Sequence, residues 1–201
     1  MQQAVKRSSD TLLEIAQHEE LKGELTFQRI LNILGERAFG VALLFFALPS
    51  ALPFSAIPGI SVVFTVPIII FACQMILARH TLWLPKIIAE RTIHHQAMSK
   101  VIHTTVPFLI KIESFLKPRW AFMTSRMMEI IHGCFIVCLA LLLMLPIPFS
   151  NFILAGLLIL FSLGLIEKDG LLLVIGYILG LLYIGLIYAV IVAMIQHVFI
   201  A

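Results

Sequence analysis

Apolar residues fill three long stretches of this chain, residues 38–78, 130–166 and 170–201, and no charged side chain interrupts any of them. Every Lys, Arg, Asp and Glu lies outside these stretches. A charged group at the centre of a bilayer costs at least ~2.5–3.5 kcal/mol, and a spanning helix needs about 20 apolar residues. We therefore interpret the three stretches as helices embedded in lipid.

The first stretch is too long for a single pass. Residues 38–78 would make one helix of about 60 Å, which is twice the thickness of the hydrocarbon core. Pro49, Pro53, Pro58 and Gly59 stand near its middle. Proline removes a helical N–H group and clashes with the preceding turn. The pattern predicts a helical hairpin with a proline-rich tip.

The second stretch repeats this design. Leu145-Pro-Ile-Pro-Phe-Ser-Asn151 breaks it near its midpoint. The segments Leu52-Pro-Phe-Ser55 and Ile147-Pro-Phe-Ser150 match, and each follows a leucine-rich run. We interpret the two hairpins as an internal repeat of the kind that builds transporters. A chance likeness of two proline-broken segments is the alternative, and the sequence leaves open whether the hairpins cross the membrane or re-enter.

The charged segments predict amphipathic helices outside the lipid. In the N-terminal arm, Phe27, Ile30, Leu31 and Leu34 recur at spacings of three and four, which is typical of one helix face. The central segment is basic, and its apolar residues also recur at helical spacing. We expect its helices to lie along the membrane face, with a small soluble subdomain as the alternative.

These patterns predict an all-α, polytopic integral membrane protein in five parts. The parts are an amphipathic arm (1–37), membrane hairpin 1 (38–78), basic amphipathic helices (79–129), membrane hairpin 2 (130–166), and a turn with a long C-terminal membrane helix (167–201). The last helix is either continuous or broken near Gly176, Gly180 or Gly185.

Charge predicts the orientation. Five passes would place all 14 Lys and Arg residues on one side, together with the N-terminus. The opposite side would hold only the two Pro-Phe-Ser tips and the C-terminus. Because cytoplasmic loops carry the excess of Lys and Arg, we expect the charged side to be cytoplasmic.

The chain shows no signature of a metalloprotease, a phosphate loop, a nucleophile elbow or a dinucleotide site. We therefore expect no enzyme activity, no cofactor and no metal. Cys73, Cys134 and Cys138 lie within apolar stretches and are interpreted as small hydrophobic side chains. Anionic lipid explains the basic segment better than nucleic acid does.

Polar residues beside the breaks and at the ends of the apolar stretches are the candidates for substrate binding. Half-helices that meet at a proline break expose N–H groups, which suit a phosphate or an anionic headgroup. The alternative is that the breaks are ordinary turns and the charges ordinary helix caps. The candidates are Glu36, Arg37, Pro58, Gly59, Gln74, Arg79, Arg119, Asn151, Glu167 and Asp169.

An ordered set of short motifs resembles the ExoD family of bacterial inner-membrane proteins from about Leu25 onward. The motifs are Leu34-Gly-Glu-Arg37, Ala47-Leu-Pro49, Ile57-Pro-Gly59, Trp83-Leu-Pro85, Lys117-Pro-Arg119, Leu145-Pro-Ile-Pro-Phe149 and Glu167-Lys-Asp-Gly170. Lys168 departs from the Arg expected in the last motif but keeps the charge.

The resemblance implies a bacterial inner-membrane protein that supports the synthesis or export of exopolysaccharide. We expect it to handle an anionic lipid-linked carrier, such as a polyprenyl phosphate. The alternative is an accessory protein that scaffolds a polysaccharide synthase or responds to membrane stress. Membrane lipids, and in the alternative polysaccharide synthesis proteins, are therefore the expected partners; the sequence leaves the oligomeric state open.

Overall fold

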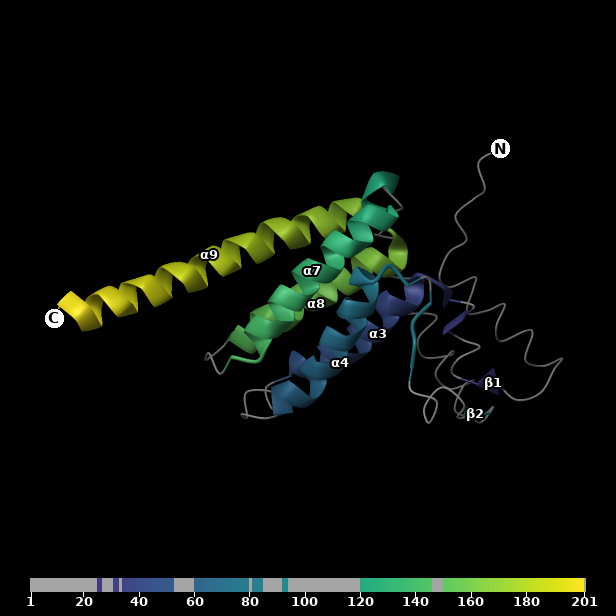
Figure 1. The fold of residues 1–201 in the computed structure, drawn as a ribbon, viewed down its shortest axis with the longest axis horizontal. Helices are drawn as coiled ribbons and strands as arrows, with labels where there is room; N and C mark the ends of the chain where they lie inside the picture. The colour runs from purple at the N-terminus through teal and green to yellow at the C-terminus, as the bar shows by residue number, and fades with distance from the viewer. Residues whose placement is uncertain are drawn as a thin grey trace.

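Five α-helices form the described part of the chain (Figure 1). The structure is a computed structural model that describes residues 25–26, 31–32, 34–52, 60–79, 81–84, 92–93, 120–145 and 150–200. The helices are α3 (Arg37–Ser50), α4 (Ile60–Ile76), α7 (Arg126–Leu143), α8 (Ser150–Glu167) and α9 (Gly170–Ile200), and a short 3-10 helix, η2 (Ala121–Thr124), precedes α7.

Helices end on both sides of each predicted break. α3 ends at Ser50 and α4 begins at Ile60, whereas α7 ends at Leu143 and α8 begins at Ser150. The tips themselves, residues 53–59 and 146–149, lie outside the described residues. α9 runs without a break past Gly176, Gly180 and Gly185, so the continuous alternative for the last stretch is the one observed.

Three of the helices are long and apolar enough to cross a membrane: Arg126–Leu143, Ser150–Glu167 and the part of α9 from Gly170 to His197. α3 and α4 are apolar but shorter, with 14 and 17 residues. At 1.5 Å per residue these two helices are about 21 and 25 Å long, which is less than the ~30 Å of hydrocarbon.

Two short strands depart from the helical expectation for the charged segments. Leu25–Thr26 (β1) pairs antiparallel with Thr92–Ile93 (β2), with Leu25 opposite Ile93 and Thr26 opposite Thr92. Three of these four residues are β-branched, which favours extended backbone. The prediction of helix for the arm and the central segment therefore does not hold at these positions, and most of both segments lies outside the described residues.

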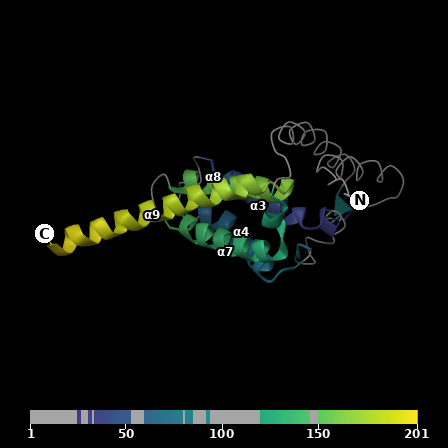
Figure 2. The same ribbon diagram turned by 90° about the horizontal axis from the view of Figure 1, so that it is seen from above.

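The helices pack most extensively across the two hairpins. α3 lies along α8 and α4 lies along α7, and the partners within each hairpin contact one another less (Figures 1 and 2). The bundle therefore consists of two cross-hairpin pairs, α3–α8 and α4–α7.

Gly40 brings the backbones of α3 and α8 together. A Cβ atom at this position would lie 2.9 Å from the Ser162 carbonyl oxygen and 3.0 Å from the Ile166 amide nitrogen. Because both atoms belong to the backbone, they could not move aside for a larger side chain. Small residues permit this close approach of helices in membranes, where packing rather than hydrophobic burial drives association.

Gly133 makes the corresponding contact between α7 and α4. Its Cβ atom would lie 2.8 Å from the Ala72 carbonyl oxygen and 3.1 Å from the Ile76 amide nitrogen. As at Gly40, the two atoms are a carbonyl oxygen and the amide nitrogen four residues later. Each cross-hairpin pair is thus closed by one glycine against one turn of its partner.

Three buried hydroxyl groups of the bundle bond to the backbone of their own helix. Ser50, Thr65 and Ser162 are buried, and each hydroxyl donates to the carbonyl oxygen four residues earlier, at 3.2, 2.6 and 2.7 Å. Such bonds satisfy a hydroxyl where no water is present.

α9 packs on the rest of the bundle through its first half. Gly176 and Gly180 leave room for the rings of Phe161 and Phe135, which a Cβ atom would approach to 2.9 and 2.7 Å. In both views the C-terminal part of α9 extends past the other helices (Figures 1 and 2). The contacts of α9 therefore lie in its N-terminal part and reach as far along α8 as Ser150, which accepts a hydrogen bond from the Tyr183 hydroxyl at 2.7 Å.

The glycine contact at Gly133 gives a stability prediction. We expect Gly133→Ala to lower the free energy of unfolding by about 1–3 kcal/mol, because the added methyl group would overlap the α4 backbone. Gly156→Ala is the matched control, since nothing lies within 4 Å of a Cβ atom there. Unfolding of both variants in mixed detergent micelles would measure the difference. Equal stability of the two variants would contradict the contact.

Candidate functional site

α4 and α8 end in the same way, and these ends build the polar end of the bundle. Ala78 and Lys168 have φ angles of +50° and +53°. The next amide in each case donates to a carbonyl five residues earlier, Arg79 to Gln74 at 3.2 Å and Asp169 to Gly164 at 3.0 Å. This left-handed termination turns the chain sharply after each helix.

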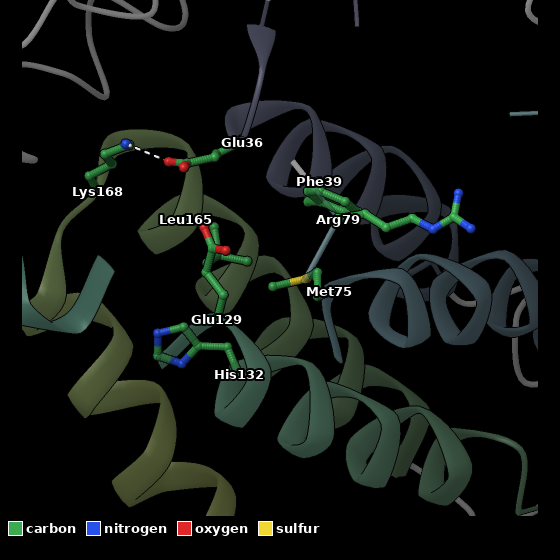
Figure 3. Close-up of a pocket in the computed structure, with 8 residues that line it drawn as sticks. All are labelled: Glu36, Phe39, Met75, Arg79, Glu129, His132, Leu165 and Lys168. Atoms are coloured by element: carbon green, nitrogen blue, oxygen red, sulfur yellow. Dashed lines mark hydrogen bonds and ion pairs between the residues drawn. The ribbon is translucent and has the colours of Figure 1, made fainter. Parts of the chain in front are cut away.

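A small cavity lies between these ends and the beginnings of α3 and α7 (Figure 3). Its volume is about 20 Å³, which is room for about one water molecule. The lining combines four charged residues, one histidine and three apolar side chains. They are Glu36, Arg79, Glu129, Lys168, His132, Phe39, Met75 and Leu165.

An ion pair joins the residue after α8 to the residue before α3. Lys168 Nζ donates to Glu36 Oε2 at 2.8 Å, with side-chain exposures of 33% and 45%. An exposed pair of this kind contributes about 0–1 kcal/mol to stability. The ion pair can therefore break at a low cost in free energy.

Glu129 presents the second carboxylate of the cavity. It lies in the first turn of α7 and is half-buried, and its side chain runs towards Leu165 (Figure 3). Within the described part of the chain, its carboxylate has no hydrogen bond or ion pair. The cavity thus holds one paired carboxylate, that of Glu36, and one that neither Lys168 nor Arg79 neutralises by contact.

His132 forms the floor of the cavity and is fully buried. Its Nε2 lies 2.8 Å from the Met123 carbonyl oxygen and its Nδ1 lies 2.6 Å from the Tyr177 hydroxyl. Because the carbonyl only accepts, Nε2 carries the proton, and in the neutral ring Nδ1 accepts from Tyr177. One side chain thereby links η2, α7 and α9.

Gln74 and Arg79, both near the end of α4, differ in burial and in hydrogen bonding. Gln74 is buried and pairs with the backbone of Trp83: the Trp83 amide donates to Oε1 at 2.7 Å, and Nε2 donates to the Trp83 carbonyl at 3.2 Å. Arg79 is exposed, and its guanidinium points away from Glu129 and Lys168 (Figure 3). Gln74 therefore holds the chain after α4, and Arg79 stands at the rim.

The structure brings two of the ten candidates, Glu36 and Arg79, into the cavity. Asp169 instead caps α9, since its Oδ1 accepts from the amides of Leu171 and Leu172 at 3.0 and 3.4 Å. Arg37 and Glu167 lie at helix ends without lining the cavity, and Asn151 lies in the first turn of α8 at the far end. Pro58, Gly59 and Arg119 lie outside the described residues.

Sequence reasoning missed Lys168, Glu129 and His132. Glu129 and His132 are three residues apart, which puts them on one helix face beside a charge-free stretch, and this spacing could have identified them. Lys168 lies in the charged turn 167–169 between two apolar stretches, but the sequence does not pair it with Glu36, which is 132 positions away along the chain.

Comparison with known proteins gives a family and two curated relatives. A family model described as "Exopolysaccharide synthesis, ExoD" matches residues 8–189. An uncharacterized protein of Synechocystis sp. is 31% identical over 187 residues, which are 90% of this chain and 88% of the relative. A protein named ExoD from Rhizobium meliloti is 32% identical over 157 residues, 76% of this chain and 65% of its own length. No solved structure matches.

The Tyr177–His132 hydrogen bond gives a second stability prediction. We expect Tyr177→Phe to cost roughly 1 kcal/mol, because it leaves a buried ring nitrogen without its donor. Tyr188→Phe removes the same hydroxyl from a side chain that is 70% exposed, so it serves as the control. Unfolding in mixed micelles would compare them, and a loss as large for Tyr188→Phe would refute the role of the bond.

Proposed function

The chain belongs to the ExoD family, and from this premise we propose that it supports exopolysaccharide synthesis by moving an anionic lipid-linked carrier, such as a polyprenyl phosphate, across the membrane. The observation that carries the proposal is the cavity at the polar end of an apolar bundle. Lys168 lies within it and Arg79 at its rim, so a phosphate that entered from the lipid would meet two cations.

The proposed orientation places this cavity at the cytoplasmic surface. Glu36, Arg79, Arg126 and Lys168 gather at one end of the helices, whereas Leu52 and Leu145 stand at the other. The positive-inside rule puts the charged end, and the N-terminus, on the cytoplasmic side of the bacterial inner membrane.

The two hairpins are proposed to be an internal repeat around this cavity. Residues 93 positions apart correspond in the first helices, as 40 and 133 do, and residues 90 positions apart in the second, as 78 and 168 do. Six of the eight lining residues then form three corresponding pairs. The pairs are Glu36 with Glu129, Phe39 with His132, and Met75 with Leu165.

Such a repeat supports a transport mechanism. Both hairpins begin and end at the cavity, so the axis relating them would run along the helices, as in transporters built from parallel repeats. The glycine contacts hold α3 to α8 and α4 to α7 at backbone distance. The cavity lies between these two pairs, and because it holds about one water, the pairs would have to separate to admit a phosphate.

Transport can be tested with labelled polyprenyl phosphate in vesicles that contain the purified protein. We expect wild-type protein to accelerate flipping and Lys168→Ala to reduce the rate about tenfold or more, since one charge-assisted hydrogen bond is lost. The φ angle at Lys168 should tolerate this change, because Ala78 adopts the same conformation.

Arg79→Ala should reduce flipping several-fold, since Arg79 acts at the rim. Arg126→Ala is the control: it removes a positive charge at the same end, where Arg126 donates to the Ala78 carbonyl outside the cavity. Absence of flipping by the wild type, or an equal effect of Arg126→Ala and Lys168→Ala, would end the proposal.

The orientation has its own test. Single cysteines at Leu52 and Leu145, which are 48% and 44% exposed, should react with an impermeant thiol reagent added outside, in a background without native cysteines. A cysteine at Arg126 should react only after the membrane is opened. The reverse pattern would invert the proposed topology.

A further inference from the structure

The two carboxylates of the cavity occupy corresponding places but differ in their partners. Glu36 receives a hydrogen bond from Lys168, whereas Glu129 is half-buried beside the apolar side chain of Leu165 and has no such contact among the described residues. Glu129 is therefore the anionic group whose charge the cavity balances least.

Binding of an anion would worsen this imbalance. A phosphate that engages Lys168 takes the cation from Glu36 and brings a further negative charge next to Glu129. Like charges that share a poorly solvated site favour protonation of one of them. The proton would come from water and form an O–H bond on the Glu129 carboxylate, which could then donate to the bound anion.

We propose that the cavity binds one proton, at Glu129, together with its anionic ligand. The inference rests on the proposed function, and it names the proton as the ion coupled to binding and movement of the carrier. By linkage, proton binding at Glu129 and anion binding at Lys168 strengthen one another by the same factor.

The other ionisable groups that face Glu129 are less suited to take this proton. His132 already uses both ring nitrogens, with Tyr177 and the Met123 carbonyl. Glu36 lies at the more exposed mouth of the cavity. The remaining groups are cations: Lys168 after α8, Arg79 after α4, and Arg126 on the same helix as Glu129.

The test measures binding of farnesyl methyl phosphate, an isoprenoid diester whose single negative charge does not titrate near neutral pH. Calorimetry on the full chain in nanodiscs, in buffers of different ionisation enthalpy, would count the protons taken up. We expect wild-type protein to take up about one proton and to lose affinity about tenfold per unit rise in pH through the alkaline limb.

Glu129→Gln should bind the same ligand without proton uptake and with an affinity that does not change with pH. Glu36→Gln, the change at the corresponding position of the other hairpin, should keep the proton uptake and bind more tightly, since Lys168 no longer has an internal partner.

The outcomes separate the two proposals. Binding without proton uptake by the wild type, or uptake that persists in Glu129→Gln or vanishes in Glu36→Gln, overturns the proton site and leaves the anion site standing. If the ligand does not bind to wild-type protein at any pH, the anion site itself is wrong and the proton site falls with it.

Discussion

A hydrocarbon environment excludes charged side chains, and the polar groups of the described bundle are distributed as this exclusion requires: its helices are apolar and its charged side chains stand at one end. The buried hydroxyls of Thr65 and Ser162 bond to their own helix, whereas those of Tyr177 and Tyr183 bond to side chains of other helices. Gln74 and His132 are buried, and each is satisfied at two positions. The charged side chains gather at one end of the bundle, where α3 and α7 begin and α4 and α8 end. The cavity forms there because these four helix ends converge around residues that cannot enter the lipid.

The same constraint explains how much of the fold was predictable. Charge-free stretches predict the helices, and the clustered prolines predict the two breaks between them. Proline position does not fix the helix ends, because Pro49 lies inside α3 and Pro67 inside α4. The cross-hairpin pairs were not predictable in this way. α3 packs on α8 because Gly40 fits against the turn at Ser162. The local sequence pattern of either helix does not indicate which helix it packs against. The strand pair of Leu25–Thr26 and Thr92–Ile93 was not predictable either, because each strand has only two residues and its partner is far along the chain.

The site was predictable in part, and the candidates that proved not to line the cavity share a common cause. The sequence pattern makes polar residues at helix ends candidate ligands, but the backbone N–H and C=O groups at a helix end also require hydrogen-bond partners. Asp169 supplies the acceptor that the first amides of α9 require, and Gln74 secures the chain after α4. Lys168 and Glu36 come together only when α3 and α8 pack, so a local pattern could not pair them.

The placement of the glycines bears on how the cavity could open. Backbone contacts at Gly40 and Gly133 fix the two cross-hairpin pairs, because separating them would lose close packing that lipid cannot replace. The contacts within each hairpin are less extensive. A movement that keeps these extensive contacts must therefore separate the α3–α8 pair from the α4–α7 pair. The Lys168–Glu36 contact lies within the α3–α8 pair, whereas Glu129 belongs to the opposite pair. In the proposed binding event Lys168 leaves Glu36 on one side of this interface and Glu129 takes up a proton on the other, so ligand binding and opening would share one set of residues.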